Sequence, residues 1–193
     1  MTPQQSAFFR QSQTDWETYQ YLHQATPSGT ASLVRKVCRL VGVRVPLLPV
    51  CHELHYLQMC TEKLAKAYFH DVGRPRTHAA FRKMFLSLRT NPNAVAPLRF
   101  SSIVELVQWI TSVQPVVDAL EDLAPAIADR PQVQKPNPEY PYPKSNPIHA
   151  PADYLFRLEV YALLDAQIQT GQPAFLMILS RMIETIQTAA WHL

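Results

Sequence analysis

Glycine is scarce in this chain, with only four among its 193 residues. Tight hairpins, phosphate-binding loops and dinucleotide-binding fingerprints all depend on glycine, because they need positive φ angles or a close approach of the backbone. The shortage excludes the common nucleotide-binding loops and argues against a fold built from β-hairpins.

Cysteine is also rare, and the pattern does not suit disulfides. The three cysteines, Cys38, Cys51 and Cys60, are an odd number and lack paired spacing, so we expect free thiols and a reducing compartment. The first ten residues show no basic region followed by an apolar run, and no uncharged apolar stretch is long enough to span a bilayer. We therefore expect a cytoplasmic protein that is neither secreted nor inserted in a membrane.

The net charge of +3 hides an uneven distribution. Between residues 30 and 100, Lys and Arg outnumber Asp and Glu by twelve to three, whereas from residue 101 onward acidic residues outnumber basic ones by ten to five. A basic half beside an acidic half favours an anionic partner or antiparallel self-association.

What the sequence does contain is apolar residues at helical spacing. The periodicity and its stop signals predict helices at residues 5–24, 31–41, 50–70, from Thr77 to the break at Asn91 and Pro92, from Ser102 onward, 152–170 and 173–190. We predict one all-α domain over residues 1–193, an up-and-down helical bundle of five to six helices.

Several local signals refine these helices. Ser102 with Glu105 forms a capping-box pattern, and the apolar phase that follows continues through Pro115, which predicts one kinked helix rather than two. Gly171 is expected to provide the left-handed cap between the last two helices. The side chains expected to face the core in the first of these two helices are Leu155, Leu158, Ala162 and Leu163.

Two other predicted helices have a clear inward stripe. In the helix at residues 50–70 it consists of Leu54, Leu57, Cys60, Thr61, Leu64, Ala67 and Tyr68. In the helix that begins at Thr77 it consists of Ala80, Phe81, Met84, Phe85 and Leu88.

A proline-rich arm is predicted at residues 129–151, where seven prolines occur. Missing backbone donors at this density forbid both helix and central strand. Because Tyr140, Tyr142 and Ile148 supply apolar anchors, we expect the arm to cross over the bundle while packed on its surface.

Residues 51–85 resemble the central helical hairpin of HEPN domains. The likeness rests on a Glu-Lys pair, an Ala-Lys-Ala run, a glycine turn and a Thr-His helix start, which here are Glu62, Lys63, Ala65, Lys66, Ala67, Gly73, Thr77 and His78. The resemblance implies a HEPN-like helical bundle that is often dimeric. Many members of that family cleave RNA or act as toxins, and others bind nucleotides or serve as interaction modules.

Catalytic HEPN domains carry an arginine and, a few residues later, a histidine near the start of the last core helix. Arg157 lies in the expected region, but no histidine follows it before Gln172. We therefore predict a non-catalytic HEPN-like interaction module that binds a protein partner, a second copy of itself, or a nucleotide or nucleic acid. The alternative is a HEPN-type ribonuclease or toxin component that uses Arg74 and His78.

An anion-binding or nucleotide-binding site is predicted at the start of one helix, where backbone donors, the helix dipole and guanidinium groups converge. Its candidate residues are Arg74, Arg76, Thr77 and His78. The competing interpretation is that Thr77 caps the helix while the arginines are solvated.

A basic surface is the candidate for nucleic-acid binding, if folding joins two charged helix faces. Its candidate residues are Arg35, Lys36, Arg39, Arg82, Lys83 and Arg89. The competing interpretation is that these charges only solvate the helices.

Two further patterns lie on the predicted helix at residues 50–70. Cys51, His52 and His55 have a spacing that a metal can use, but a zinc site needs ligands from a second helix, so we expect no metal and no cofactor. Glu62 is predicted to pair with Lys66 at the i,i+4 spacing of a helix.

Overall fold

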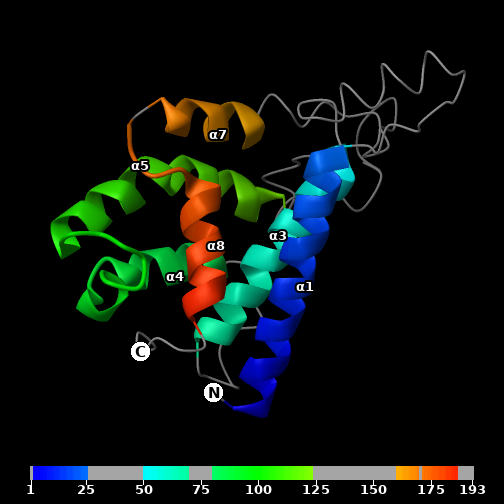
Figure 1. Cartoon of the computed structure of the whole chain (residues 1–193), viewed down its shortest axis with the longest axis horizontal. Coiled ribbons are helices and arrows are strands. Elements are labelled where there is room, and N and C mark those ends of the chain that lie inside the picture. Colours follow the sequence, from blue (N-terminus) through cyan, green and yellow to red (C-terminus); the bar gives the residue numbers. More distant parts are fainter. Residues whose placement is uncertain (1, 26–49, 70–79, 124–159, 170, 187–193) are drawn as a thin grey trace, which may run out of the picture.

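The computed structural model describes residues 2–25, 50–69, 80–123, 160–169 and 171–186, and this part of the chain is entirely helical, without strands. Its α-helices are α1 (Pro3–Ala25), α3 (Val50–Tyr68), α4 (Ala80–Leu88), α5 (Ile103–Asp122), α7 (Val160–Ile168) and α8 (Phe175–Thr185), with a 3₁₀ turn η1 (Pro92–Ala94) (Figure 1). The predicted all-α fold class is confirmed. The helix expected at residues 31–41 and the arm at 129–151 lie outside the described residues.

Helices α1 and α3 form a long antiparallel pair, which α4, α5 and α8 contact, whereas α7 packs mainly on α5 and α8. Figure 1 shows them side by side, and residues early in α1 contact residues late in α3. Gln5 near the start of α1 meets Ala67 near the end of α3, whereas His23 near the end of α1 meets Glu53 near the start of α3.

The first turn of α1 is fixed by a capping box that the sequence analysis did not identify. Thr2 Oγ1 accepts a hydrogen bond from the backbone N–H of Gln5 at 3.2 Å, and Gln5 Oε1 accepts one from the backbone N–H of Thr2 at 2.6 Å. Pro3 occupies the first helical position, where its missing donor costs nothing. Helix α1 therefore begins at residue 3, two residues before the prediction.

Helix α3 is the central helix, and it contacts α1, α4 and α5. Every apolar position predicted to form its stripe is buried, including Leu54, Leu57, Leu64 and Tyr68. The Tyr68 hydroxyl accepts a hydrogen bond from Ser87 on α4 at 3.1 Å. Glu53, Gln58 and Glu62 of α3 are also buried, although they lie outside the apolar stripe. This is expected, because a helix that contacts neighbours on several sides is buried around most of its circumference.

Helix α4 presents all five of its predicted core residues, Ala80, Phe81, Met84, Phe85 and Leu88, to the interior. Phe85 is the centre of an aromatic cluster. Its ring centroid lies 4.9 Å from that of Phe81, 5.7 Å from that of Trp109 on α5 and 6.2 Å from that of Phe175 on α8. These rings join three helices through large buried apolar surfaces.

Helix α5 is continuous across Pro115, which confirms one helix rather than two. Ser102 is the N-cap, and its hydroxyl accepts the backbone N–H of Glu105 at 3.2 Å. The reciprocal half of the capping box is displaced by one residue, because the Glu105 carboxylate accepts from the N–H and hydroxyl of Ser101.

The turn between α7 and α8 contains Gly171 with φ +70°, which confirms the predicted left-handed residue. Gln167 links the two helices: its amide nitrogen donates to the Pro173 carbonyl at 2.8 Å, and its amide oxygen accepts from the backbone N–H of Phe175 at 2.9 Å. In Figure 1, α5 and α7 run across the direction of α1 and α8.

One predicted core position on α7 is wrong. Ala162 is exposed and Leu163 is only partly buried, while the buried residues are Val160, Leu164 and Gln167. The buried face is therefore rotated relative to the prediction. Leu155 and Leu158, expected on the same face, lie outside the described residues. Among the described helices, none has the length and apolar character required to cross a membrane.

Candidate functional site

The interface between α1 and α3 contains several buried polar side chains. Gln5, Ser12 and Asp15 all lie on the side of α1 that faces α3. The Gln5 side chain donates to the Ala67 carbonyl at 3.1 Å, near the end of α3, where carbonyls lack partners within their own helix. The Ser12 hydroxyl donates to the Cys60 carbonyl at 3.0 Å.

The interface ends in a cluster of titratable groups contributed by three helices. Glu53 lies in the first turn of α3, and its side chain is only 3% exposed. The hydroxyl of Tyr161, the second residue of α7, donates a hydrogen bond to this carboxylate. His23, in the last turn of α1, has Nδ1 3.6 Å from a Glu53 oxygen, and its side chain is 41% exposed.

Aromatic rings line the same cluster. The His23 ring stacks with Tyr19, with centroids 5.4 Å apart, and with Tyr161, with centroids 6.2 Å apart. Tyr19 also stacks on Trp16 at 5.3 Å. The electron-rich faces of these rings favour a positive charge on the imidazole.

The electrostatics of the cluster favour a protonated histidine. The Glu53 carboxylate raises the pKa of His23 against the opposing effect of burial. Burial, assisted by the nearby Glu53 charge, raises the pKa of Tyr19, so that phenol stays neutral at physiological pH. A half-exposed imidazole backed by a buried carboxylate is an arrangement able to take up and release a proton near neutral pH.

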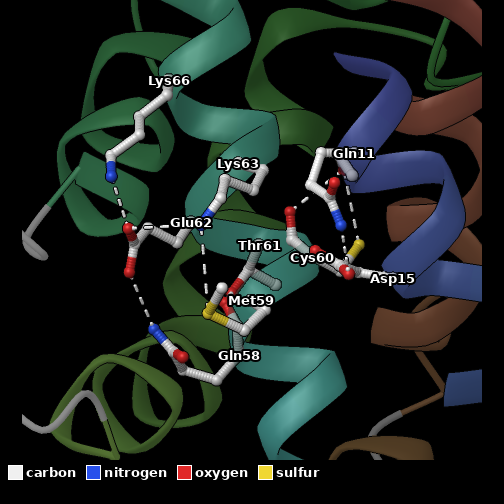
Figure 2. A network of polar contacts seen from close by, with 10 residues as sticks. Gln11, Asp15, Gln58, Met59, Cys60, Thr61, Glu62, Lys63 and Lys66 are labelled. Atoms are coloured by element: carbon white, nitrogen blue, oxygen red, sulfur yellow. Dashed lines mark hydrogen bonds and ion pairs between the residues drawn. The ribbon is translucent and has the colours of Figure 1, made fainter. Parts of the chain in front are cut away.

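A second polar network surrounds Glu62, as Figure 2 shows. Its carboxylate accepts from Gln58 at 3.1 Å and pairs with Lys66 at 2.5 Å, which confirms the predicted pair. Lys63 lies 3.8 Å from the same carboxylate. Glu62 is buried, and its contacts with Gln58 and Lys66, four residues before and after it, tie successive turns of α3 together.

Asp15 and Cys60 lie on the other side of this network (Figure 2). Asp15 accepts from the Gln11 amide at 2.9 Å, and burial raises the pKa of its carboxyl group. Burial also raises the pKa of the Cys60 thiol to about 12, which makes it a poor nucleophile.

The predicted basic residues of α4 do not all remain available to a partner. Arg82 Nε lies 2.6 Å from Asp118 and 3.5 Å from Glu121, both on α5. Lys83 and Arg89 are exposed. The other candidates, Arg35, Lys36, Arg39, Arg74, Arg76, Thr77 and His78, lie outside the described residues.

The Cys51, His52 and His55 pattern is only partly open to solvent. His52 is exposed, whereas Cys51 is buried and the His55 ring makes an edge contact with Tyr56 at 5.2 Å. Within the ranges that the structure describes, no three His, Cys, Asp or Glu side chains are arranged to hold a metal ion.

The cluster of His23, Glu53 and Tyr161 was not predicted from the sequence. One signal was available: in an antiparallel helix pair, the last turn of the first helix lies beside the first turn of the second, and these turns carry His23 and Glu53. No local pattern in the sequence indicates that Tyr161 joins this cluster, because its position depends on how α7 packs against helices far away in the chain.

Comparison with known proteins adds no assignment. No protein-family model matches the chain, and neither a curated protein nor a solved structure shows significant similarity to it.

Proposed function

We propose that this chain is a non-catalytic, HEPN-like helical interaction module that binds a second copy of itself or a protein partner. The observation that carries the proposal is the position of Glu62. This residue of the HEPN-like pattern is buried and is held by Gln58 and Lys66. A carboxylate used in this way serves the core of the module rather than a reaction.

The surroundings of α3 support the same assignment. Ala65 and Ala67, from the Ala-Lys-Ala part of the pattern, are fully buried. Small side chains at these positions allow neighbouring helices to approach α3 closely. The pattern therefore has a packing explanation that requires no catalytic chemistry.

The charges on α4 favour a protein partner over a nucleic acid. Arg82 forms ion pairs with Asp118 and Glu121, so its positive charge is already neutralised and is less available to bind a phosphate group. A surface that tracks a nucleic-acid backbone depends on several cations free to displace counterions. With Arg82 paired, Lys83 and Arg89 are the candidate basic residues that stay exposed in the described part of the chain.

The described surface also carries large apolar side chains. Four of them, each on a different helix, are well exposed: Tyr21, Leu86, Val104 and Met177. Single exposed apolar residues are also common on monomers. These four side chains therefore offer apolar contact area to a partner but do not define a binding groove. The uneven charge of the two halves would add orientation to such a contact.

Size-exclusion chromatography with light scattering tests the proposal. We expect a dimer or larger assembly at low salt and a shift toward monomer as salt rises, because screening weakens contacts between oppositely charged halves. A monomer at both salt concentrations and at high protein concentration, together with no protein partner recovered in a pull-down, would contradict the proposal.

Incubation with single-stranded RNA separates this proposal from the ribonuclease alternative. We expect the RNA to remain intact. Cleavage that His78→Ala abolishes and His52→Ala leaves unchanged would establish the alternative. His52 is a suitable control because it is an exposed histidine on α3, outside the Arg74 and His78 pair.

A further inference from the structure

The cluster of His23, Glu53 and Tyr161 joins three helices that are far apart in the chain. Glu53 on α3 accepts a hydrogen bond from Tyr161 on α7 and lies 3.6 Å from His23 Nδ1 on α1. The rings of His23 and Tyr161 stack with an interplanar angle of 10°. One titratable imidazole thus contacts both a residue of α3 and a residue of α7.

A proton on His23 changes both contacts in the same direction. The positive charge attracts the buried carboxylate of Glu53, and it also improves the stacking on the tyrosine rings through a cation–π interaction. When the proton leaves, both attractions are lost together. The groups that face His23 among the described residues are Glu53 from α3, Tyr161 from α7 and Tyr19 from its own helix.

We propose that His23, Glu53 and Tyr161 form a proton-operated latch that fastens α7 to the α1–α3 pair. The latch is closed when His23 is protonated and loosens when the imidazole is neutral. It goes beyond the proposed interaction function, because it concerns how the module changes shape and not what it binds.

The direction of the response follows from the chemistry of the cluster. Glu53 raises the pKa of His23 above its ordinary value, so the closed latch holds the proton more tightly than the open one. Its stabilisation is complete below a pH of about 6.5, the ordinary value for histidine, and is lost as the pH rises through the raised pKa. The latch therefore opens toward alkaline pH.

The latch lies at the ends of three helices. Helix α1 ends at residue 25, α3 begins at residue 50, and α7 begins at residue 160. His23, Glu53 and Tyr161 each lie within four residues of these ends, so a change in the latch acts directly on the helix termini.

Nuclear magnetic resonance combined with hydrogen exchange tests the latch on the full chain. We expect the His23 imidazole to titrate above a pH of about 6.5, the ordinary pKa value for histidine. We expect amide protection in α7 to fall several-fold as His23 loses its proton, after correction for the pH dependence of chemical exchange. Protection in α4, which has its own contacts with α5, serves as the internal reference.

Two matched variants assign the effect. His23→Gln should abolish the pH dependence of α7 protection, whereas His52→Gln should leave it as in the native chain. Glu53→Gln should lower the pH at which His23 titrates. The proposal is overturned if α7 protection is the same on both sides of the His23 titration, or if Glu53→Gln does not move that titration.

Tyr161→Phe keeps the experiment decisive if Glu53→Gln does not fold, as judged by circular dichroism. This variant keeps the ring that stacks on His23 and removes only the hydroxyl that donates to Glu53. We expect weaker α7 protection at every pH, because one of the two links between α7 and the α1–α3 pair is gone. Protection equal to that of the native chain would overturn the latch.

Discussion

The carboxylate of Glu121 on α5 accepts a hydrogen bond from the backbone N–H of Arg82 at 2.7 Å and so caps the first turn of α4 from a different helix. The first N–H groups of a helix lack partners within that helix, and a carboxylate near them is also favoured by the helix dipole. Glu121 additionally lies 3.5 Å from the Arg82 guanidinium. A single acidic residue therefore links α4 to α5 through both backbone and side chain.

Glu121→Ala is expected to lower the free energy of unfolding by about 1–3 kcal/mol, because it removes a cap and leaves a partly buried N–H without its acceptor. Glu121→Gln should cost less, since an amide oxygen can still accept that hydrogen bond. Urea denaturation measures both. Glu17→Ala, an exposed acidic residue on α1, is the control and should stay within about 0.5 kcal/mol of the native chain. Equal stability of Glu121→Ala and Glu17→Ala would contradict the capping role.

Asp15→Asn is expected to stabilise the protein at neutral pH, with a rise in Tm on the order of 2 °C. Burial raises the pKa of Asp15, so the folded state binds its proton more tightly than the unfolded state does. The native chain therefore gains stability as the pH falls through the raised pKa, and it loses that gain as the pH rises above it. Asparagine lacks the buried charge but can keep the hydrogen bond from Gln11.

Thermal unfolding at a series of pH values checks this prediction. The advantage of Asp15→Asn should shrink as the pH falls and vanish once Asp15 is protonated in the native chain. The matched control is Asp165→Asn, because Asp165 is an exposed carboxylate on α7. A constant difference between Asp15→Asn and the native chain across the whole pH series would rule out the explanation from burial of the charge.

Cys60 is expected to resist thiol reagents in the folded protein. Its pKa of about 12 leaves almost no thiolate at neutral pH, and the side chain is completely buried beside Ser12. Labelling with iodoacetamide, followed by peptide mass spectrometry, should modify Cys60 only after denaturant unfolds the chain. Rapid modification of Cys60 under native conditions would show that the α1–α3 pair opens readily.

Gly171→Ala is expected to destabilise the protein by about 1–2 kcal/mol, because φ at this position is +70° and an L-residue with a Cβ is strained there. In the described part of the chain, no atom beyond the adjacent residues lies within 4 Å of the added Cβ, so the cost arises from the backbone rather than from a clash. Gly171→Asn should cost less, since asparagine tolerates the left-handed region better than alanine does. Equal costs for the two substitutions in chemical denaturation would contradict a backbone origin.

Local signals in the sequence were enough to predict the elements that depend on neighbours in the chain. The stripe of α3, the five inward residues of α4, the Ser102 cap and the left-handed Gly171 were all predicted correctly. Each depends on side-chain periodicity or on the conformational preference of a single residue type, and both can be recognised without knowing the tertiary structure.

Where the prediction failed, tertiary packing decided the outcome. Residues 160–164 of α7 are all apolar or aromatic, so periodicity alone could not define which side faces inward, and Ala162 was assigned to the core wrongly. Asp15, Glu53 and Glu121 are charged residues that sequence alone places at the surface, yet all three are buried. Their burial depends on partners in other helices, and so the candidate site was not predicted.

The polar side chains between α1 and α3 have a consequence for how the two helices can slide. Gln5 reaches the carbonyl of Ala67 and Ser12 reaches the carbonyl of Cys60 only when the helices are aligned as they are. A displacement of one helical turn would strand these donors in an apolar environment, at about 1–3 kcal/mol for each. The register of α1 against α3 is therefore fixed. Movements elsewhere in the bundle must leave this helix pair unchanged.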